Sequence, residues 1–109
     1  MVSYFVRYRG TSPDPARFIG YYETRHTPIL QQFPSIRSLI LHRAVNWVDP
    51  FPVRPGGTML LAQMICDTSE ALDAALRSDA RRLARDDFRN FPAFDGEVAH
   101  EAMEATIQF

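Results

Sequence analysis

The sequence predicts an α+β fold whose elements follow in the order strand, helix, strand, strand, helix, strand. Four runs rich in Val, Ile, Leu, Tyr or Phe have the length and composition of strands. Two longer stretches carry apolar residues three and four positions apart, which is the spacing of a helix with one buried face. The chain has 109 residues, 46% hydrophobic and 23% charged, and can therefore form one core without a metal or a disulfide.

The first predicted strand covers residues 2–9 and ends at Gly10. In the turn that follows, TSPDP, Asp14 has the character of a helix N-cap, and Pro15 occupies the first helical position. A proline is favoured there because its missing N–H would have no partner in the helix. A helix is therefore expected to begin at this point.

One face of this helix is predicted to comprise Phe18, Tyr22, His26, Ile29 or Leu30, and Phe33. Pro28 lacks an N–H, and its ring would clash with the carbonyl of Thr24 in a regular helix. We therefore expect a kink or break at residues 26–28 and a short turn that ends near Phe33.

The sequence of the middle of the chain predicts two strands separated by a loop. Residues 36–46 are apolar on both faces, as in a central or doubly covered strand. Residues 47–57 hold three of the eight prolines and a glycine pair, and form the loop. Loops of this length often border a site, and this one carries Trp47. The next strand covers residues 58–66.

The second half begins with a helix signal. Asp67 and Glu70 have the spacing of an acidic capping box, and the helix that follows is interrupted at Ser78. A further helical piece, DARRLARDDF, leads into the aromatic connection FRNFPAFDG. The fourth strand is predicted over residues 97–107.

This order is the ferredoxin-like split βαβ arrangement, with a four-stranded antiparallel sheet and both helices on one face. The other face of such a sheet has no cover within the chain. A second copy of the same sheet is the simplest cover, so we expect a homodimer.

Composition excludes several classes of function. The net charge of −1 gives no basic footprint for nucleic acid or for an anionic membrane surface. All twelve basic residues are arginines, so Schiff-base chemistry, a P-loop lysine and lysine-bound pyridoxal phosphate are excluded. The single cysteine, Cys66, cannot form an internal disulfide, and no run resembles a membrane span or a signal peptide. A cytoplasmic setting is expected.

His26 is the first candidate for chemistry. It shares a helix face with Phe18 and Tyr22 and so points toward the sheet. An imidazole exchanges protons near neutral pH because its ordinary pKa is about 6.5. The hydroxyl of Tyr22 can orient the imidazole or bind a substrate oxygen. The residues alone leave open the alternative that both side chains belong to the core.

The other histidines do not predict a metal site. Strand alternation places His42 on the side of Ile40, where it faces either the cleft or a dimer interface. His100 lies in the last strand, and no H-x-H or H-x-x-x-H pair is present. Cys66 ends a strand and is expected to be a small buried hydrophobe, because no base can be placed beside it.

An aromatic cluster, either core or the wall of a pocket, comprises Phe88, Phe91, Phe94, Trp47 and Phe51. Asp86 and Asp87 diverge by about 100° on a helix and do not form a carboxylate pair. A salt-bridged outer face is expected from Arg77, Arg81, Arg82, Arg85 and Arg89.

The stretch FIGYYETRHTPILQQFPSIRSLILHRAV resembles the N-terminal pattern of EthD-type proteins, a branch of the dimeric α+β barrel superfamily. The pattern is an aromatic-led helix ending in His-x-Pro, then a turn into a strand; here it comprises Tyr22, His26, Pro28, Phe33, Pro34 and Ile36. Where the family usually has a glycine in that turn, this chain has Ser35. The segment EALDAALRSDARRLARDDFRNF is similar to the later helix of the family, with its serine break and acidic-aromatic ending.

The resemblance implies a dimeric α+β barrel with a cleft between sheet and helices that accepts small cyclic molecules. Members include methylmuconolactone isomerases and cofactor-free oxygenases of aromatic polyketides. We therefore expect residues 1–109 to form one EthD-like domain that needs no cofactor. It would isomerise or oxygenate a lactone, phenol or quinone-like substrate in a catabolic or secondary-metabolic pathway.

In this interpretation His26 and Tyr22 are the catalytic residues. The predicted substrate-binding residues are Phe18, Arg25, His42, Trp47, Phe88 and Phe91. Two alternatives remain open. One is a non-catalytic dimeric module that binds a small molecule. The other is a haem- or metal-binding α+β barrel with His26 or His100 as the ligand.

Overall fold

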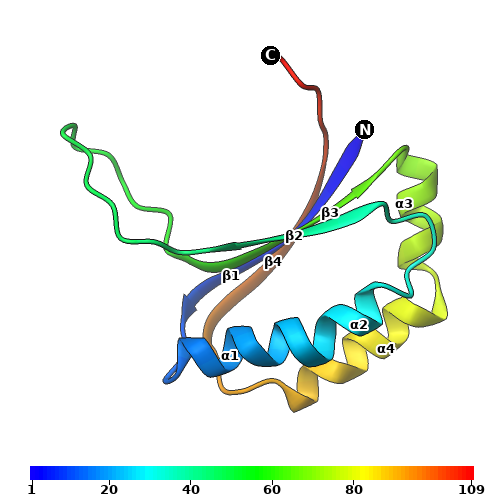
Figure 1. The fold of residues 1–109 in the computed structure, drawn as a ribbon, viewed down its shortest axis with the longest axis horizontal. Helices are drawn as coiled ribbons and strands as arrows, with labels where there is room; N and C mark the ends of the chain where they lie inside the picture. The colour runs from blue at the N-terminus through cyan, green and yellow to red at the C-terminus, as the bar shows by residue number, and fades with distance from the viewer.

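A four-stranded antiparallel sheet carries its helices on one face (Figure 1). The computed structural model describes residues 1–109. The elements are, in chain order, β1 (Val2–Thr11), α1 (Pro15–Tyr21), the π-helical turn η1 (Tyr22–His26), α2 (Thr27–Leu30), β2 (Ser38–Arg43), β3 (Thr58–Cys66), α3 (Ser69–Leu76), α4 (Asp79–Asp87), the 3₁₀ turn η2 (Phe88–Asn90) and β4 (Asp95–Glu104). The predicted ferredoxin-like α+β fold is confirmed.

The strand order is β2-β3-β1-β4, so β1 pairs with both β3 and β4. Tyr4 of β1 lies opposite Met64 on one side and Ala102 on the other. Because side chains alternate along a strand, these residues share the face that the helices cover. The core therefore lies between the sheet and the helical layer, and its buried strand residues include Tyr4, Val6, Tyr8, Leu60, Ala62 and Met64.

The first helix is continuous, so the predicted break at residues 26–28 is wrong. The chain keeps helical geometry through Thr27, whose N–H donates to the carbonyl of Tyr22 five residues earlier. Such a π-turn adds one residue to the helix and widens it. Pro28 follows directly, at the start of α2, and contributes no N–H to the backbone bonding of the continuous helix. The chain thus accommodates the proline next to a wider turn rather than by a break in the helix.

Local polar groups start the helices. Asp14 caps α1 by accepting from the N–H of Arg17 at 3.1 Å, as predicted. The predicted acidic capping box is wrong, because Thr68 caps α3 and accepts from the N–H of Ala71 at 3.1 Å. Asp67 instead pairs with the side chain of Arg37 at the surface. Ser78 separates α3 from α4 and caps α4, as the sequence indicates.

Strand ends differ from the predictions in three places. β1 continues past Gly10 to Thr11, because Gly10 lies opposite Gly96 and the two backbones approach too closely for a Cβ. β2 is shorter than predicted and covers Ser38–Arg43. β4 begins at Asp95 and ends at Glu104, whereas β3 has the predicted bounds.

The face of the sheet opposite the helices is open (Figure 1). Its side chains alternate with those of the core and include Phe5, Arg7, Ile40, His42, Leu61, Gln63, Ile65 and Met103. The loop between β2 and β3 projects away from the sheet, and its Trp47 is 55% exposed. None of the helices combines the length and apolar character needed to cross a bilayer.

Candidate functional site

The π-turn aims two aromatic side chains at the sheet. Tyr22 and His26 are 1% and 3% exposed, respectively. The imidazole of His26 lies among aromatic rings, with centroids 4.8 Å from Tyr22, 4.8 Å from Phe91 and 5.8 Å from Phe88. Apolar rings on several sides exclude water from this imidazole, so its hydrogen-bond partners determine its chemistry.

Asp87, at the end of α4, is the hydrogen-bond partner of His26. Its Oδ2 lies 2.9 Å from Nδ1 of His26. Its Oδ1 accepts from the hydroxyl of Tyr21 at 2.7 Å and from the side-chain amide of Asn90 at 3.1 Å. Both carboxylate oxygens are therefore engaged, and Asp87 is held in one orientation.

This arrangement determines the tautomer of His26. An ionised carboxylate only accepts hydrogen bonds, so Nδ1 of the imidazole carries the proton that the two groups share. The lone pair is then on Nε2, which has no hydrogen-bond partner within the chain. The structure therefore presents a neutral imidazole with its basic nitrogen free.

The pKa values of the pair agree with this assignment. Burial lowers the pKa of His26, and the neighbouring Asp87 opposes that effect without cancelling it. Burial by itself would raise the pKa of Asp87. The hydrogen bonds from Tyr21, His26 and Asn90 together outweigh burial and hold it below its ordinary value. At neutral pH the pair is an uncharged imidazole beside an anionic carboxylate.

His26 lines a hollow between the sheet and the helices, here called the central cavity. It has a volume of about 20 Å³. Its lining comprises Tyr4, Val6, Tyr8, Tyr22, His26, Leu30, Phe33, Met64, Arg81, Ala84, Arg85, Phe88 and His100. In this form the cavity holds roughly one water, so a ring enters only if lining side chains move.

The hydroxyl of Tyr8 is a second unpaired polar group in the central cavity. It is buried and has no hydrogen-bond partner. Burial is the main reason that the pKa of Tyr8 is raised, so the phenol is protonated and can donate. A buried hydroxyl without a partner costs about 1–3 kcal/mol, a cost that a ligand oxygen would remove.

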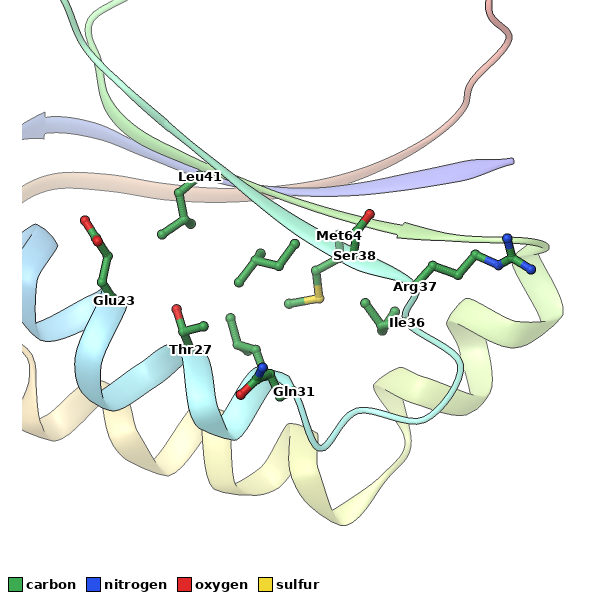
Figure 2. A pocket seen from close by; sticks show the side chains of 10 residues that line it. Glu23, Thr27, Gln31, Ile36, Arg37, Ser38, Leu41 and Met64 are labelled. Carbon is green, nitrogen blue, oxygen red and sulfur yellow. The ribbon is translucent and has the colours of Figure 1, made fainter.

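A larger groove lies between the first helix and the edge strand β2 (Figure 2). This edge groove has a volume of about 550 Å³. Its charged side chains are both paired, Glu23 with Arg43 at 3.2 Å and Arg37 with Asp67 at 2.9 Å. It therefore offers no free acid or base, and the central cavity remains the candidate active site.

Shared side chains separate the central cavity from its neighbours. Leu30 and Met64 line both the central cavity and the edge groove. Tyr8 and Phe88 line both the central cavity and a third hollow of about 370 Å³, which is walled by the aromatic connection before β4.

No family model matches the chain. An uncharacterized 11.0 kDa protein in the thcB-thcC intergenic region of Rhodococcus erythropolis is 30% identical over 78 residues, which are 72% of each chain. That identity over that share of both chains establishes a common family.

Solved structures share the fold over nearly the whole chain. An EthD (ethyl tert-butyl ether D) family protein from Bacillus halodurans C-125 has a TM-score of 0.76 at 22% identity, covering 97% of this chain and 99% of its own. A dimeric ferredoxin-like protein of unknown function from Thermobifida fusca YX has a TM-score of 0.65 at 9% identity, covering 95% and 90%. SnoaB, a cofactor-independent oxygenase from Streptomyces nogalater, has a TM-score of 0.64 at 15% identity, covering 98% and 94%.

The chain belongs to the same family as the Rhodococcus protein. Its fold is that of the EthD family protein from Bacillus, in agreement with the resemblance identified from the sequence. The same fold occurs in the Thermobifida protein, described as dimeric and ferredoxin-like, and in SnoaB, described as a cofactor-independent oxygenase.

Four of the predicted site residues lie in or beside the central cavity. His26, Tyr22 and Phe88 line it, and Phe91 contacts the imidazole. Phe18 is 1% exposed and packs against Phe91 farther from the imidazole. Tyr22 touches the imidazole ring, but its hydroxyl does not bond to it, so the residue that orients His26 is Asp87.

Three other predicted substrate-binding residues lie away from the central cavity. Arg25 is exposed on the outer side of the π-turn. His42 lies on the open face of the sheet, 3.0 Å from the side chain of Gln63. Trp47 is on the projecting loop. The sequence around each of these residues predicts its helix, strand or loop, but only the packing shows which side of that element faces the cavity.

Asp87 and Tyr21 are the residues that sequence analysis missed. At the level of sequence, Asp87 is considered only as a neighbour of Asp86, and Tyr21 is assigned no role. One signal in the sequence was available. Asp87 falls on the helix positions of Ala80 and Ala84, the buried stripe of the otherwise charged α4. A carboxylate on an apolar stripe requires a partner inside the protein.

The remaining histidines and the cysteine form no metal-binding cluster. No three His, Cys, Asp or Glu side chains of the chain come together as a potential metal-binding group. Nδ1 of His100 is 2.7 Å from the hydroxyl of Tyr4, on the helix side of the sheet. Cys66 is buried at the end of β3, and burial raises the pKa of its thiol.

Proposed function

We propose that this protein is a cofactor-independent enzyme that acts on a small hydrophobic cyclic substrate in the central cavity, with His26 as the general acid and base. One observation carries the proposal. A buried imidazole is held by a carboxylate on one nitrogen, and its other, basic nitrogen is free beside an aromatic-lined cavity. The substrate class is a lactone, a phenol or a quinone-like ring.

The chemistry follows from the tautomer. Nε2 of His26 removes a proton from an acidic C–H or O–H of the bound ring, and Asp87 stabilises the imidazolium that results. The enolate or phenolate then has two outcomes. The imidazolium returns the proton to a different atom, which completes an isomerisation, or the anion gives an electron to dioxygen, which begins an oxygenation. A positioned base of this kind contributes about 10²- to 10⁴-fold in rate.

Two features support this assignment over simple binding. His26 is almost fully shielded from water, which protects a reactive anion and strengthens the interaction with Asp87. SnoaB, a protein of the same fold, is described as a cofactor-independent oxygenase. A binding module would require neither a free ring nitrogen nor a carboxylate to set its tautomer.

Proton exchange provides the most general test, because it reports base catalysis before the full reaction is known. A panel of unsaturated lactones and polycyclic phenols is incubated with the protein in D₂O, and deuterium uptake at carbon is followed by NMR. An oxygen electrode detects oxygenation in parallel. His26→Ala should slow exchange at least about a hundredfold. Asp86→Asn is the matched control, because Asp86 is exposed and pairs only with surface arginines. Exchange or turnover that survives in His26→Ala would refute the role of His26.

We also propose that the protein is a homodimer in which two open sheet faces meet. Apolar side chains on that face have no cover within the chain; they include Phe5, Ile40, Leu61, Ile65 and Met103. The Thermobifida protein of the same fold is described as dimeric. Sedimentation equilibrium should give twice the chain mass, and Leu61→Asp should give a folded monomer. A wild-type monomer at micromolar concentration would contradict the proposal.

A further inference from the structure

Resting on the proposed function, we propose that the substrate of the central cavity is an anion, a ring that bears a carboxylate, and that Arg81 and Arg85 bind this carboxylate. The proposal specifies a chemical class of ligand and gives two arginines a role that their helical spacing alone did not reveal.

Arg81 and Arg85 lie one turn apart on α4, and both line the central cavity together with His26. Neither takes part in an ion pair of the chain. The guanidinium of Arg81 instead lies 5.9 Å from the ring centre of Tyr4, and that of Arg85 lies 5.1 Å from the ring centre of Phe88. Both positive charges therefore border the cavity without a negative partner.

Other arginines of the same segment make the contrast clear. Arg82 and Arg89 both pair with Asp86 on the outer side, at 3.5 and 3.8 Å. The salt-bridged outer face predicted from the sequence is thus correct for these two and wrong for Arg81 and Arg85. The charges that face the cavity are the ones that lack a partner within the chain.

The charge of the cavity lining has one sign. No Asp or Glu lines the cavity, whereas Arg81 and Arg85 do. The nearby carboxylate of Asp87 is turned to Nδ1 of His26 and also accepts from Tyr21 and Asn90. The positive charges of Arg81 and Arg85 help burial to lower the pKa of His100. A site with positive charges and no carboxylate in its lining favours an anionic ligand over a neutral one.

The two arginines border the cavity through different neighbours. Arg81 lies over Tyr4, whose hydroxyl is hydrogen-bonded to His100. Arg85 lies over Phe88, which also packs against the imidazole of His26. A ring with a carboxylate fits this arrangement, because the carboxylate can pair with the guanidinium groups while the ring presents an acidic atom to His26.

The two arginines are accessible to an incoming ligand. Arg85 is exposed and Arg81 is half-buried, whereas most of the apolar lining is buried. Long exposed side chains of this kind rotate at less cost than packed core residues do.

The test compares one-ring probes that differ in charge but not in shape. Benzoate, benzamide and phenyl phosphate are titrated into the full-length protein, and binding is measured by calorimetry and NMR. Benzoate should bind at least about tenfold more tightly than benzamide. Arg81→Gln and Arg85→Gln should each weaken benzoate binding about tenfold and leave benzamide unchanged. Arg82→Gln is the matched control and should leave both unchanged.

Several outcomes overturn the proposal. These are equal affinity for benzoate and benzamide, no binding of benzoate up to millimolar concentration, an equal loss in Arg82→Gln, or a preference for phenyl phosphate over benzoate. Circular dichroism confirms that each variant is folded. If neutral rings exchange protons through His26 and the arginine variants have no effect, this inference fails and the proposed function stands. If benzoate binds through the arginines but His26→Ala exchanges protons normally, the proposed function fails and the anion site stands.

Discussion

Asp87→Asn changes the tautomer of His26 while leaving the shape of the site almost unaltered. Asparagine has one accepting oxygen and one donating NH₂ group in place of two accepting oxygens. Tyr21 and Asn90 both donate to Oδ1 of Asp87, so the amide oxygen stays on their side. The NH₂ group then faces Nδ1 of His26, 2.9 Å away, where it can only donate. The imidazole must carry its proton on Nε2, and the base that faces the cavity is lost.

The magnitude follows from what the base contributes. Positioned bases contribute about 10²- to 10⁴-fold in rate, and reversing the tautomer by the same change in a Ser-His-Asp enzyme lowers kcat about 10⁴-fold. We therefore expect kcat to fall about 10²- to 10⁴-fold. Folding should lose about 1–3 kcal/mol, because hydrogen bonds to a charged buried acceptor become neutral ones.

Nitrogen NMR of the imidazole measures the tautomer directly. The wild type should carry the proton on Nδ1 of His26, and Asp87→Asn should carry it on Nε2. Asp86→Asn is the control, since it removes a neighbouring carboxylate that bonds only with surface arginines. An Nε2-protonated imidazole in the wild type would refute the reasoning, as would an unchanged tautomer and turnover in Asp87→Asn.

Three further predictions follow from the same contacts. The pKa values of His26 and His100 are lowered in the folded state, so the unfolded chain binds protons more readily than the folded chain. The free energy of unfolding should therefore fall as pH drops below about 6.5. Urea titrations should show a shallower fall for His26→Gln than for the wild type. Tyr21→Phe removes one donor to Asp87, which should raise the pKa of that carboxyl and cost about 0.5–1.5 kcal/mol by thermal unfolding; an unchanged pKa by NMR would contradict this contact. Met64→Ala removes a buried side chain that lies between the central cavity and the edge groove. The free energy of unfolding should fall by about 2–5 kcal/mol, and two-ring carboxylates should bind more tightly. Unaltered binding would show that Met64 does not separate the two spaces.

Features set by neighbouring residues were predictable. The N-cap at Asp14 depends on contacts within one turn, and β3 has the predicted bounds because its composition and flanks are local signals. The order of the elements leaves few topologies open, which is why the sheet and its open face were foreseen. The resemblance in the His-x-Pro region added the family and drew attention to His26.

Features set by long-range packing were not predictable. His26 and Asp87 are 61 positions apart, and no local pattern states that the two side chains meet. Alternation placed His42 on one side of its strand without showing that this side is the open face. Pro28 signalled a disturbed helix, but the wider π-turn that keeps it continuous also holds Tyr22 and His26 toward the sheet.

What the sequence by itself determined is the set of elements, their order and the presence of a histidine on a buried helix face, because these follow from spacing along one chain segment. Only the tertiary structure decided which carboxylate orients that histidine and which arginines border its cavity. Arg81 and Arg82 are adjacent in sequence, yet one lines the cavity and the other pairs with Asp86 outside. The difference depends on how α4 is rotated against the sheet, and that rotation is set by packing of the whole core.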